Sequence, residues 1–584
     1  MAPLELVIFT ILTAISVVSG SSLSLDHRCR CIPGDACWPS AKQWDRLNST
    51  LQGRLIATSP LARVCHGHDY NQESCNELKT NWDLPETHMY VPGEFDAPYW
   101  QTNETCNPFT PINSLCTLGN FASYSINVSK AEDIISGFEF AQVHNVRVVV
   151  KNTGHDYLGK STGKGSLAFW TANLKGSTLI PQYTSKQYKG PALKIGAGMT
   201  AGEVYQAAYS LGYRFVGGEC PTVGLAGGYS QGGGHSPLQS IYGMGADNVL
   251  EWEVVTPTGE HITATPDGPH ADLYWALSGG GGGTFGVVLS MTSRIHEDGP
   301  VGGANLTIVA ADNTQASLDA LWEVVDYFHA NELGPIVDKG ITLTYSLTNV
   351  SFGFYAATAP DQTGAYISDA LASFTRYLDA AGITYELANT TSASYYEHMD
   401  YYFGPMPLGR YPIAQLTGGR LIPRATVLGG DAPRQKLISA FRDITKNGDY
   451  YLAFTASNLE LASAAGNVNT SRNAVLPTWR SSIFHVITVS PWDLTLPREK
   501  FLTRQDELTG TVMPLLEAAT PGSGSYLNEA NFQQPNWQKE FYGVNYARLS
   551  DIKAKVDPLG LMYGRTAVGS DKWAEDAEGR LCRI

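Results

Sequence analysis

Apolar residues recur at helical spacing in the first half of the chain, and short β-branched runs follow them. Residues 129–141 begin with Ser-Lys-Ala-Glu and place apolar residues on one face, which predicts a helix opened by a capping box. A buried strand is expected next, over 146–150. A second capping box at 200–203 predicts a short helix that ends near Gly212, followed by a strand over 213–216.

Strand-like alternation begins at residues 249–264 and recurs from about residue 300. Residues 249–264 alternate around a Pro-Thr-Gly turn at 257–259, which indicates two strands joined by that turn. From about 300 to 520 the pattern predicts a second domain built on an antiparallel sheet, with strands at 341–345 and 351–355 and helices near 315–330 and 364–381. Apolar residues from Trp537 to Val556 have roughly helical spacing, and Asp557-Pro558 stops the pattern, so we expect a final helix that closes the fold.

The length of 584 residues predicts two or three domains. Residues 23 to about 110 are rich in Cys, Pro, Asn and Trp and have weak periodicity, which indicates a segment held by disulfides. We therefore expect an α+β protein. Its parts are a signal peptide at 1–20, a disulfide-stapled segment at 21–114, a glycine-rich α+β domain at 115–298, the sheet domain at 299–520 and a C-terminal segment at 521–584.

The N-terminus indicates secretion. Leu4 to Val18 is an apolar run followed by small residues, as in a signal peptide, and it is shorter than the roughly 20 residues of a membrane span. No later segment is long and apolar enough to cross a membrane. Asn-x-Ser/Thr sequons, which are compatible with glycosylation, occur at Asn48, Asn103, Asn127, Asn305, Asn349, Asn389 and Asn469.

Charge and cysteine count narrow the function classes further. A net charge of −15 without a dense basic tract argues against nucleic-acid binding. The nine cysteines are an odd number for an oxidising compartment, so one thiol is left to explain. If Cys582 pairs with the N-terminal cluster, eight cysteines form four disulfides and Cys220 is the one that remains.

Glycine loops that follow strands suit phosphate binding, because exposed N–H groups can approach an anion. Residues 196–201, Gly-Ala-Gly-Met-Thr-Ala, superficially match the dinucleotide fingerprint of the Rossmann fold, with Glu219 about 20 residues on. The next strand leads into further glycine loops and not into a second βα unit, which argues against that fold.

Two separate segments carry a more specific signal. They are Asn-Thr-Gly-His-Asp-Tyr-Leu-Gly at 152–159 and Gly-Gly-Glu-Cys-Pro-Thr-Val-Gly-Leu-Ala-Gly-Gly at 217–228, which continues to Gly234-His235. In these segments the chain resembles the berberine-bridge-enzyme-like branch of the vanillyl-alcohol-oxidase flavoprotein family, especially its secreted fungal members. The resemblance extends over about 115–298 and 525–570. It implies a PCMH-type FAD-binding domain of two α/β subdomains, completed by the C-terminal segment, and a separate substrate domain.

The resemblance also implies the cofactor and its ligands. His155 would bond to the 8α-methyl group of FAD and Cys220 to C6, a bicovalent attachment that fits two nucleophiles and an electron-poor ring. By themselves, His155 could be a hydrogen-bonded loop residue and Cys220 a small buried one. Residues implied along the pyrophosphate are Thr153, Gly154, Asp156, Tyr157 and Leu158, and those implied elsewhere along the cofactor are Gly224, Gly228, His235 and Val287. His235 could instead contact substrate.

The catalytic base is expected on the C-terminal segment. Plant members of the family carry Tyr-x-Asn-Tyr, whereas this chain has Tyr526-Leu-Asn528-Glu529, so Glu529 takes the place of the last tyrosine. A carboxylate is a poor base at neutral pH unless burial raises its pKa, and a salt-bridged glutamate is the alternative. Lesser catalytic candidates are Tyr402, Tyr401 and His398, in an aromatic cluster of the second domain, and the alternative is that they shape the substrate pocket or the core.

These features predict a secreted, FAD-linked oxidase that takes hydride from an alcohol, an amine or a secondary-metabolite intermediate and uses O₂ as acceptor, giving H₂O₂. We expect a monomer that binds a small molecule. The alternatives are a flavin dehydrogenase or oxidative cyclase and a binding protein on the same scaffold. No metal is expected, because His66-Gly-His68-Asp69 lacks further ligands and is interpreted as a surface loop.

Overall fold

The structure is a computed structural model that describes residues 28–94, 106–413, 415–466, 468–493 and 495–584. The expected signal peptide at 1–20 lies outside the described residues. The N-terminal segment contains three helices, α1 (Ala41–Thr50), α2 (Gln72–Asn81) and α3 (Pro85–Met89). In its predicted surface loop, His68 is exposed but His66 is buried, with its ring nitrogens 3.2 and 2.9 Å from the carbonyl oxygens of Pro111 and Asn107.

The first sheet has the order β1-β2-β4-β3, with β4 parallel to both of its neighbours. Its strands are β1 (Leu55–Ala57), β2 (Tyr124–Asn127), β4 (Leu167–Trp170) and β3 (Val148–Lys151). Helix α4 (Ala131–His144) leads into β3, as predicted, and it follows β2, which was not predicted. The expected capping box is wrong in detail. The helix begins one residue later than a box with Glu132 would require, so Asp133 takes the place of Glu132. The backbone N–H and the hydroxyl of Ser129 both donate to Asp133, which also pairs with Arg54.

The second sheet is antiparallel and has the order β5-β6-β10-β8-β9. Its strands are β5 (Ser177–Thr184), β6 (Lys189–Gly196), β10 (Val287–Arg294), β8 (Val249–Val255) and β9 (His261–Ala264), and β7 (Tyr213–Arg214) pairs separately with β11 (His296–Glu297). The capping box of Thr200 and Glu203 is confirmed at the start of α5 (Ala201–Ser210). Because β6 is antiparallel to both neighbours, residues 196–201 do not belong to a Rossmann unit.

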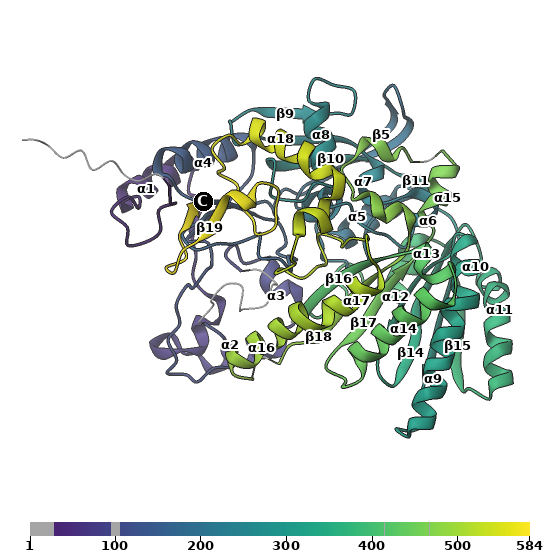
Figure 1. Cartoon of the computed structure of the whole chain (residues 1–584). Coiled ribbons are helices and arrows are strands. Elements are labelled where there is room, and N and C mark those ends of the chain that lie inside the picture. The colour runs from purple at the N-terminus through teal and green to yellow at the C-terminus, as the bar shows by residue number, and fades with distance from the viewer. Residues whose placement is uncertain (1–27, 95–105, 414, 467, 494) are drawn as a thin grey trace, which may run out of the picture.

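The third sheet confirms the predicted antiparallel domain. Its order is β15-β12-β14-β13-β17-β18-β16, and every pair is antiparallel. The strands are β12 (Val301–Val309), β13 (Thr342–Leu347), β14 (Ser351–Pro360), β15 (Tyr385–Ser392), β16 (Gln415–Pro423), β17 (Tyr451–Ala456) and β18 (Ser482–Pro491). Figure 1 shows helices packed along this sheet, among them α9 (Gln315–Tyr327), α11 (Gly364–Ala381), α14 (Asp431–Thr445) and α17 (Met513–Ala519).

Shorter helices complete the two lobes of the molecule. The first lobe contains the first and second sheets, and the second lobe contains the third sheet. Between β7 and β10 the chain forms α6 (Gln239–Tyr242), α7 (Gly245–Asn248) and α8 (Ala271–Leu277). Around the third sheet it forms α10 (Leu333–Asp338), α12 (Tyr395–Phe403), α13 (Arg424–Leu428), α15 (Leu459–Ala464) and α16 (Arg498–Glu507).

The two faces of the third sheet serve different purposes. Because side chains alternate along a strand, Tyr345 of β13 and Phe454 of β17 stack on each other, with ring centroids 4.3 Å apart, and pack with Phe441 of the covering helix α14. Their neighbours Thr344 and Thr455 point to the opposite face, where a cavity lies. One face therefore forms an aromatic core with the helices, and the other forms a wall of the cavity.

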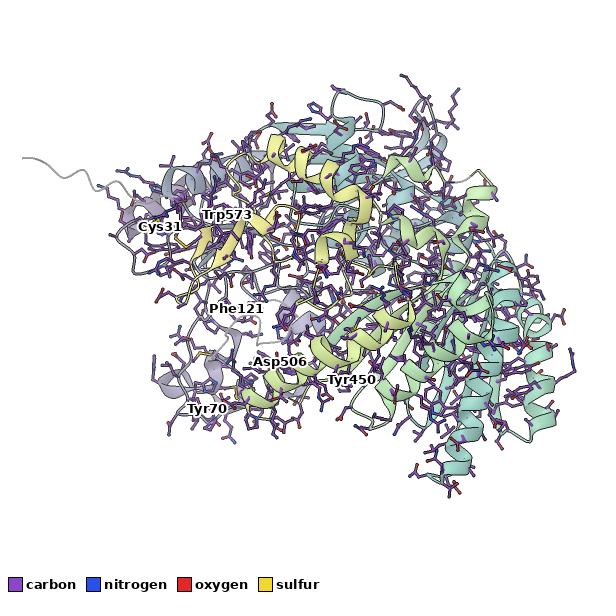
Figure 2. The ribbon with its side chains drawn as sticks, viewed as in Figure 1. Cys31, Tyr70, Phe121, Tyr450, Asp506 and Trp573 are labelled. Carbon is purple, nitrogen blue, oxygen red and sulfur yellow. A yellow bond between two sulfur atoms is a disulfide. The ribbon has the colours of Figure 1, made fainter. Side chains whose placement is uncertain are left out.

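The C-terminus differs from the prediction that a final helix closes the fold. Helix α18 (Tyr546–Val556) is present, but a hairpin of β19 (Trp573–Glu575) and β20 (Leu581–Arg583) follows it. Cys582 of this hairpin is bonded to Cys29, and the guanidinium carbon of Arg30 lies 4.8 Å from the Trp573 ring centroid. Figure 2 shows Cys31 and Trp573 in this same part of the molecule, where the N-terminal segment meets the C-terminal hairpin.

The disulfide arithmetic is confirmed. The pairs are Cys29–Cys582, Cys31–Cys37, Cys65–Cys75 and Cys106–Cys116, and Cys220 is the free cysteine. Among the described residues, no helix is both long enough and apolar enough to span a membrane.

The Cys29–Cys582 disulfide joins residues 553 positions apart, whereas Cys65–Cys75 joins residues 10 apart. In the chain-entropy model, removing the long link should lower the free energy of unfolding by about 3 to 4 kcal/mol more than removing the short one. Denaturant melts of Cys29→Ser/Cys582→Ser and of the control Cys65→Ser/Cys75→Ser measure this difference. Equal losses in the two variants would show that the long link adds no special constraint.

Candidate functional site

A cavity of about 630 Å³ lies between the glycine loops of the first lobe and the inner face of the third sheet. All but one of the predicted site residues line it: Thr153, Gly154, His155, Asp156, Tyr157, Leu158, Cys220, Gly224, Gly228, His235, Tyr402, Tyr526, Asn528 and Glu529. Val287 is the exception. Its side chain is fully buried in the apolar cluster that includes Val255 and Leu289, and its neighbours Gly286 and Val288 reach the cavity instead.

The glycine loops let backbone form the cavity wall. A Cβ on Gly224 would lie 1.8 Å from Oδ1 of Asn152, whereas a Cβ on Gly228 would meet no atom within 4 Å. The Asn152 amide nitrogen donates to Thr171 Oγ1 and to the Ala197 carbonyl, at 2.9 and 2.7 Å, while its Oδ1 is buried without a hydrogen-bond partner among the described residues. The cavity therefore offers backbone groups and an unpaired acceptor to an extended polar ligand.

Lys160 brings a positive charge to the loop that contains His155. It lines the cavity, and burial lowers its pKa to about 8 although Asp156 opposes the shift. The Asp156 carboxylate accepts the backbone N–H groups of Leu158 and Ser161, at 3.0 and 2.6 Å, and thereby fixes the loop. An ammonium group beside backbone N–H groups suits a pyrophosphate. The sequence analysis missed Lys160, although it directly follows Gly159 of the quoted motif.

His155 and Cys220 meet across the cavity wall. Nε2 of His155 lies 2.6 Å from Thr222 Oγ1 and 4.0 Å from Sγ of Cys220, and that sulfur lies 3.3 Å from the same hydroxyl. Burial opposes ionisation of the Cys220 thiol, but the nearby charge of His155 and hydrogen bonds from His155 and Thr222 outweigh it and lower the thiol pKa. A thiolate is the nucleophilic form of cysteine. The pair can therefore attack one electrophile from two adjacent positions.

Glu529 lies between two imidazole rings. Its carboxylate is 3.0 Å from Nε2 of His235 and 3.3 Å from Nδ1 of His485. Burial alone would raise the Glu529 pKa, but interaction with the two histidines holds it well below its usual range. In the opposite sense, burial would lower the pKa of His235, but Glu529 raises it to about 9. Glu529 thus lacks the raised pKa that a base at neutral pH requires, and it is paired with His235.

His485 was not predicted. It lies on β18 at a strand position with no motif around it, and burial lowers its pKa. With His235 and Glu529 it places three potential metal-ligand atoms within 4.8 Å of one another. Two histidines and one carboxylate are a donor set that transition metals accept. His235 and Glu529 form a hydrogen-bonded ion pair, whereas the buried ring nitrogens of His485 have no hydrogen-bond partner among the described residues.

Tyr526 and Asn528 connect the C-terminal segment to the glycine run. The Tyr526 oxygen accepts the backbone N–H of Gly234 at 3.2 Å and the amide of Asn528 at 2.8 Å, and that amide also donates to the Gly228 carbonyl at 3.0 Å. Two donors on the phenol oxygen leave its own proton available to a ligand.

In the aromatic cluster of the second lobe, only Tyr402 lines the cavity, and its hydroxyl lies 2.8 Å from Thr390 Oγ1. His398 is fully buried and its Nε2 lies 2.9 Å from Thr358 Oγ1. Tyr401 is 61% exposed. The cluster therefore contributes one of its three members to the site.

Comparison with known proteins agrees with this geometry. The FAD binding domain family matches residues 122–265, and the "Berberine and berberine like" family matches residues 525–567. The chain is 44% identical to the VAO-type flavoprotein oxidase VAO615 of Thermothelomyces thermophilus over 585 residues, covering 100% of both chains. The chain belongs to the VAO-type family of FAD-linked oxidoreductases.

Other members are similar over the whole chain. The bifunctional decalin synthase calF of Penicillium decumbens is 44% identical over 592 residues, covering 100% of this chain and 99% of the relative. The crystal structure of MtVAO615 from Myceliophthora thermophila C1 superposes with a TM-score of 0.90 at 44% identity, covering 95% of this chain and 100% of that one. This VAO-type chain is thus an oxidoreductase of a fungal secondary-metabolite family, acts on small molecules and uses FAD as its cofactor.

The Glu529–His235 pair of the enzyme should make stability depend on pH. The folded pKa of His235, about 9, exceeds its ordinary value of 6.5, so its stabilisation is complete below pH 6.5 and disappears as the pH rises through 9. The folded pKa of Glu529 is lowered, so the contribution of Glu529 to stability is fully present above pH 4.5. It disappears as the pH falls toward the lowered pKa.

The melting temperatures of wild type and Glu529→Gln should therefore differ most between pH 4.5 and 6.5 and converge above pH 9. The control is Glu540→Gln, which breaks an ion pair with Arg420 that contains no histidine and should cause a loss of constant size between pH 6.5 and 9. Calorimetric scans across this range measure both. A constant difference for Glu529→Gln would contradict the assigned ion pair.

Proposed function

We propose that this enzyme is a secreted oxidase that holds FAD covalently through both His155 and Cys220. The observation that carries the proposal is the approach of His155 Nε2 to Cys220 Sγ, at 4.0 Å, with the thiol pKa lowered at that position. The residues present fit the cofactor, since glycine loops form the cavity wall beside His155 and Cys220, Lys160 supplies a cation and Asn152 Oδ1 is an unpaired acceptor.

FAD, when bound, accepts the hydride of a substrate C–H bond and passes the electrons to O₂, which becomes H₂O₂. The residues of the chain would hold the substrate for this reaction. We propose that the Tyr526 hydroxyl, which accepts two N–H groups, donates a hydrogen bond to a substrate oxygen and that Asn528 keeps the phenol in this orientation. Glu529 would keep His235 protonated beside it, and Tyr402 would bound the opposite side of the cavity.

The cavity wall supports a flat, partly apolar substrate with hydroxyl groups. Aromatic side chains line the part of the cavity that faces the third sheet, namely Tyr355, Tyr402, Phe403, Tyr411 and Tyr451. Hydroxyl groups of Thr344, Ser346, Thr417 and Thr455 lie among them. Such a surface suits a secondary metabolite carrying an alcohol more than a small aliphatic alcohol.

A second candidate is an oxidative cyclase or dehydrogenase that transfers electrons to another acceptor. The relative named bifunctional decalin synthase, at 44% identity, favours this possibility. A binding protein without catalysis is not supported, because the relatives are named oxidases and oxidoreductases. The four disulfides support secretion, and we propose that the secreted enzyme is a monomer.

Variants at the two attachment residues test the covalent links. His155→Ala and Cys220→Ser should each retain flavin after denaturation, with an absorption spectrum shifted from that of wild type, because one bond remains. The double variant should release FAD into the supernatant when the protein is precipitated. Wild-type absorption in Cys220→Ser would show that the sulfur forms no bond, and free FAD from denatured wild type would refute covalent attachment altogether.

Anaerobic mixing with a panel of hydroxylated metabolites and oligosaccharides tests the oxidase function. A true substrate should bleach the flavin without oxygen, and admission of O₂ should restore the colour with one H₂O₂ released per substrate oxidised. Bleaching that persists in air but reverses with an artificial electron acceptor would favour the dehydrogenase. A panel that bleaches nothing, while dithionite does, would count against oxidation of these substrate classes.

A further inference from the structure

Glu219 directly precedes Cys220 and lines the same cavity, but it has no role in the proposed binding of FAD or substrate. Its carboxylate reaches across to the third sheet. Oε1 accepts the hydroxyl of Thr344, on β13, at 2.7 Å and that of Thr455, on β17, at 3.4 Å, and Oε2 accepts the hydroxyl of Tyr355, on β14, at 3.4 Å. Three neutral hydroxyls from three strands therefore fix this carboxylate at the cavity wall.

Glu219 differs from Glu529 and Glu540 in having no cationic partner. Glu529 pairs with His235 and Glu540 with Arg420, whereas no Lys, Arg or His nitrogen of the described chain lies within 4.0 Å of Glu219. Burial raises its pKa, although the charge of His235 opposes the shift. A carboxyl group whose pKa approaches the working pH can accept a proton and release it again.

We propose that Glu219 is the general base that takes the hydroxyl proton of the substrate. The proposal rests on the oxidase function proposed above and names the proton acceptor for that reaction. The O–H bond of the substrate breaks, its proton bonds to a Glu219 carboxylate oxygen, and its electron pair forms the new C=O bond. The C–H bond loses its hydrogen with two electrons, as hydride, to the FAD. Glu219 then returns the proton to water as the product leaves.

Position favours Glu219 over Glu529 for this step. Glu219 is adjacent in the chain to Cys220, the proposed attachment residue, so its carboxylate is tied to the edge of the cofactor site. Thr344 and Thr455 both contact Oε1, so Oε2, with only the longer contact to Tyr355, is the freer oxygen. Glu529, in contrast, is held by two imidazole rings. The Glu219 carboxylate thus lies at the cavity and can change its protonation state, because no cation holds it ionised.

The surroundings of Glu219 leave few other groups that could titrate in its place. Those that interact with it are His235, Glu529, Tyr229, Tyr355 and Tyr411, which line the cavity, and Tyr205 and Tyr395, which do not. Burial raises the pKa of Tyr355 and Tyr411 well above the ordinary range, so both stay neutral. His235 and Glu529 form the ion pair already described.

The test compares holoenzymes of wild type, Glu219→Gln and the control Glu540→Gln, each first shown to retain covalent flavin. The pH-difference infrared spectrum reports the carboxyl group without any substrate. Wild type and Glu540→Gln should show a protonated C=O stretching band that disappears as the pH is raised, and Glu219→Gln should lack that band. A band that persists in Glu219→Gln, or that is absent from wild type, overturns the proposal.

Stopped-flow reduction with the metabolite that bleaches wild type provides the second measurement. Glu219→Gln should be reduced about 10²- to 10⁴-fold more slowly and should lose the acidic limb of the pH profile, whereas Glu219→Asp should restore part of the rate. Equal rates and pH profiles in wild type and Glu219→Gln would refute the role of Glu219 alone. Failure of every metabolite to bleach wild type would instead count against the oxidation of these substrate classes, on which the proposal rests.

Discussion

Close approach of backbone to backbone is the constraint on which the rest of this structure depends. A Cβ on Gly282 would lie 3.1 Å from Cα of Gly228, and one on Gly224 would collide with Asn152. Loops packed this closely expose peptide N–H groups where an ordinary residue would present a side chain. The same constraint extends to the second lobe, where a Cβ on Gly419 would lie 1.9 Å from the carbonyl oxygen of Glu529. A side chain at any of these positions would displace the groups packed against it.

Charge within the cavity is arranged in separate groups, each with its own partners. The cation of Lys160 lies on the loop beside Asp156, the Cys220 thiol is activated by His155 and Thr222, and Glu529 is neutralised by His235. Glu219 is held by hydroxyl groups without a cation. Two carboxylates in one cavity therefore have opposite pKa shifts, which is the condition under which two acids can have different roles.

The sequence was most informative where local rules decide the structure. The capping box at Thr200, the hairpin around 257–259 and the antiparallel third sheet follow from residue type and spacing, and the structure confirms them. The two motifs around His155 and Cys220 also predicted the part of the cavity lining that the glycine loops provide. Their residues are consecutive, so a single stretch of sequence displays them together.

Contacts between distant segments could not be predicted in this way. His485 lies 44 positions before Glu529 on a strand without a motif, and the hydroxyls around Glu219 come from three different strands. The prediction for Val287 was wrong for a related reason, since the alternation along β10 directs its side chain into the core and that of Val288 toward the cavity.

Peptide mapping of the digested holoenzyme by mass spectrometry is the most direct test of covalent attachment through both His155 and Cys220. The account predicts one species in which a single FAD joins the peptides of His155 and Cys220, and recovery of both peptides unmodified would contradict it.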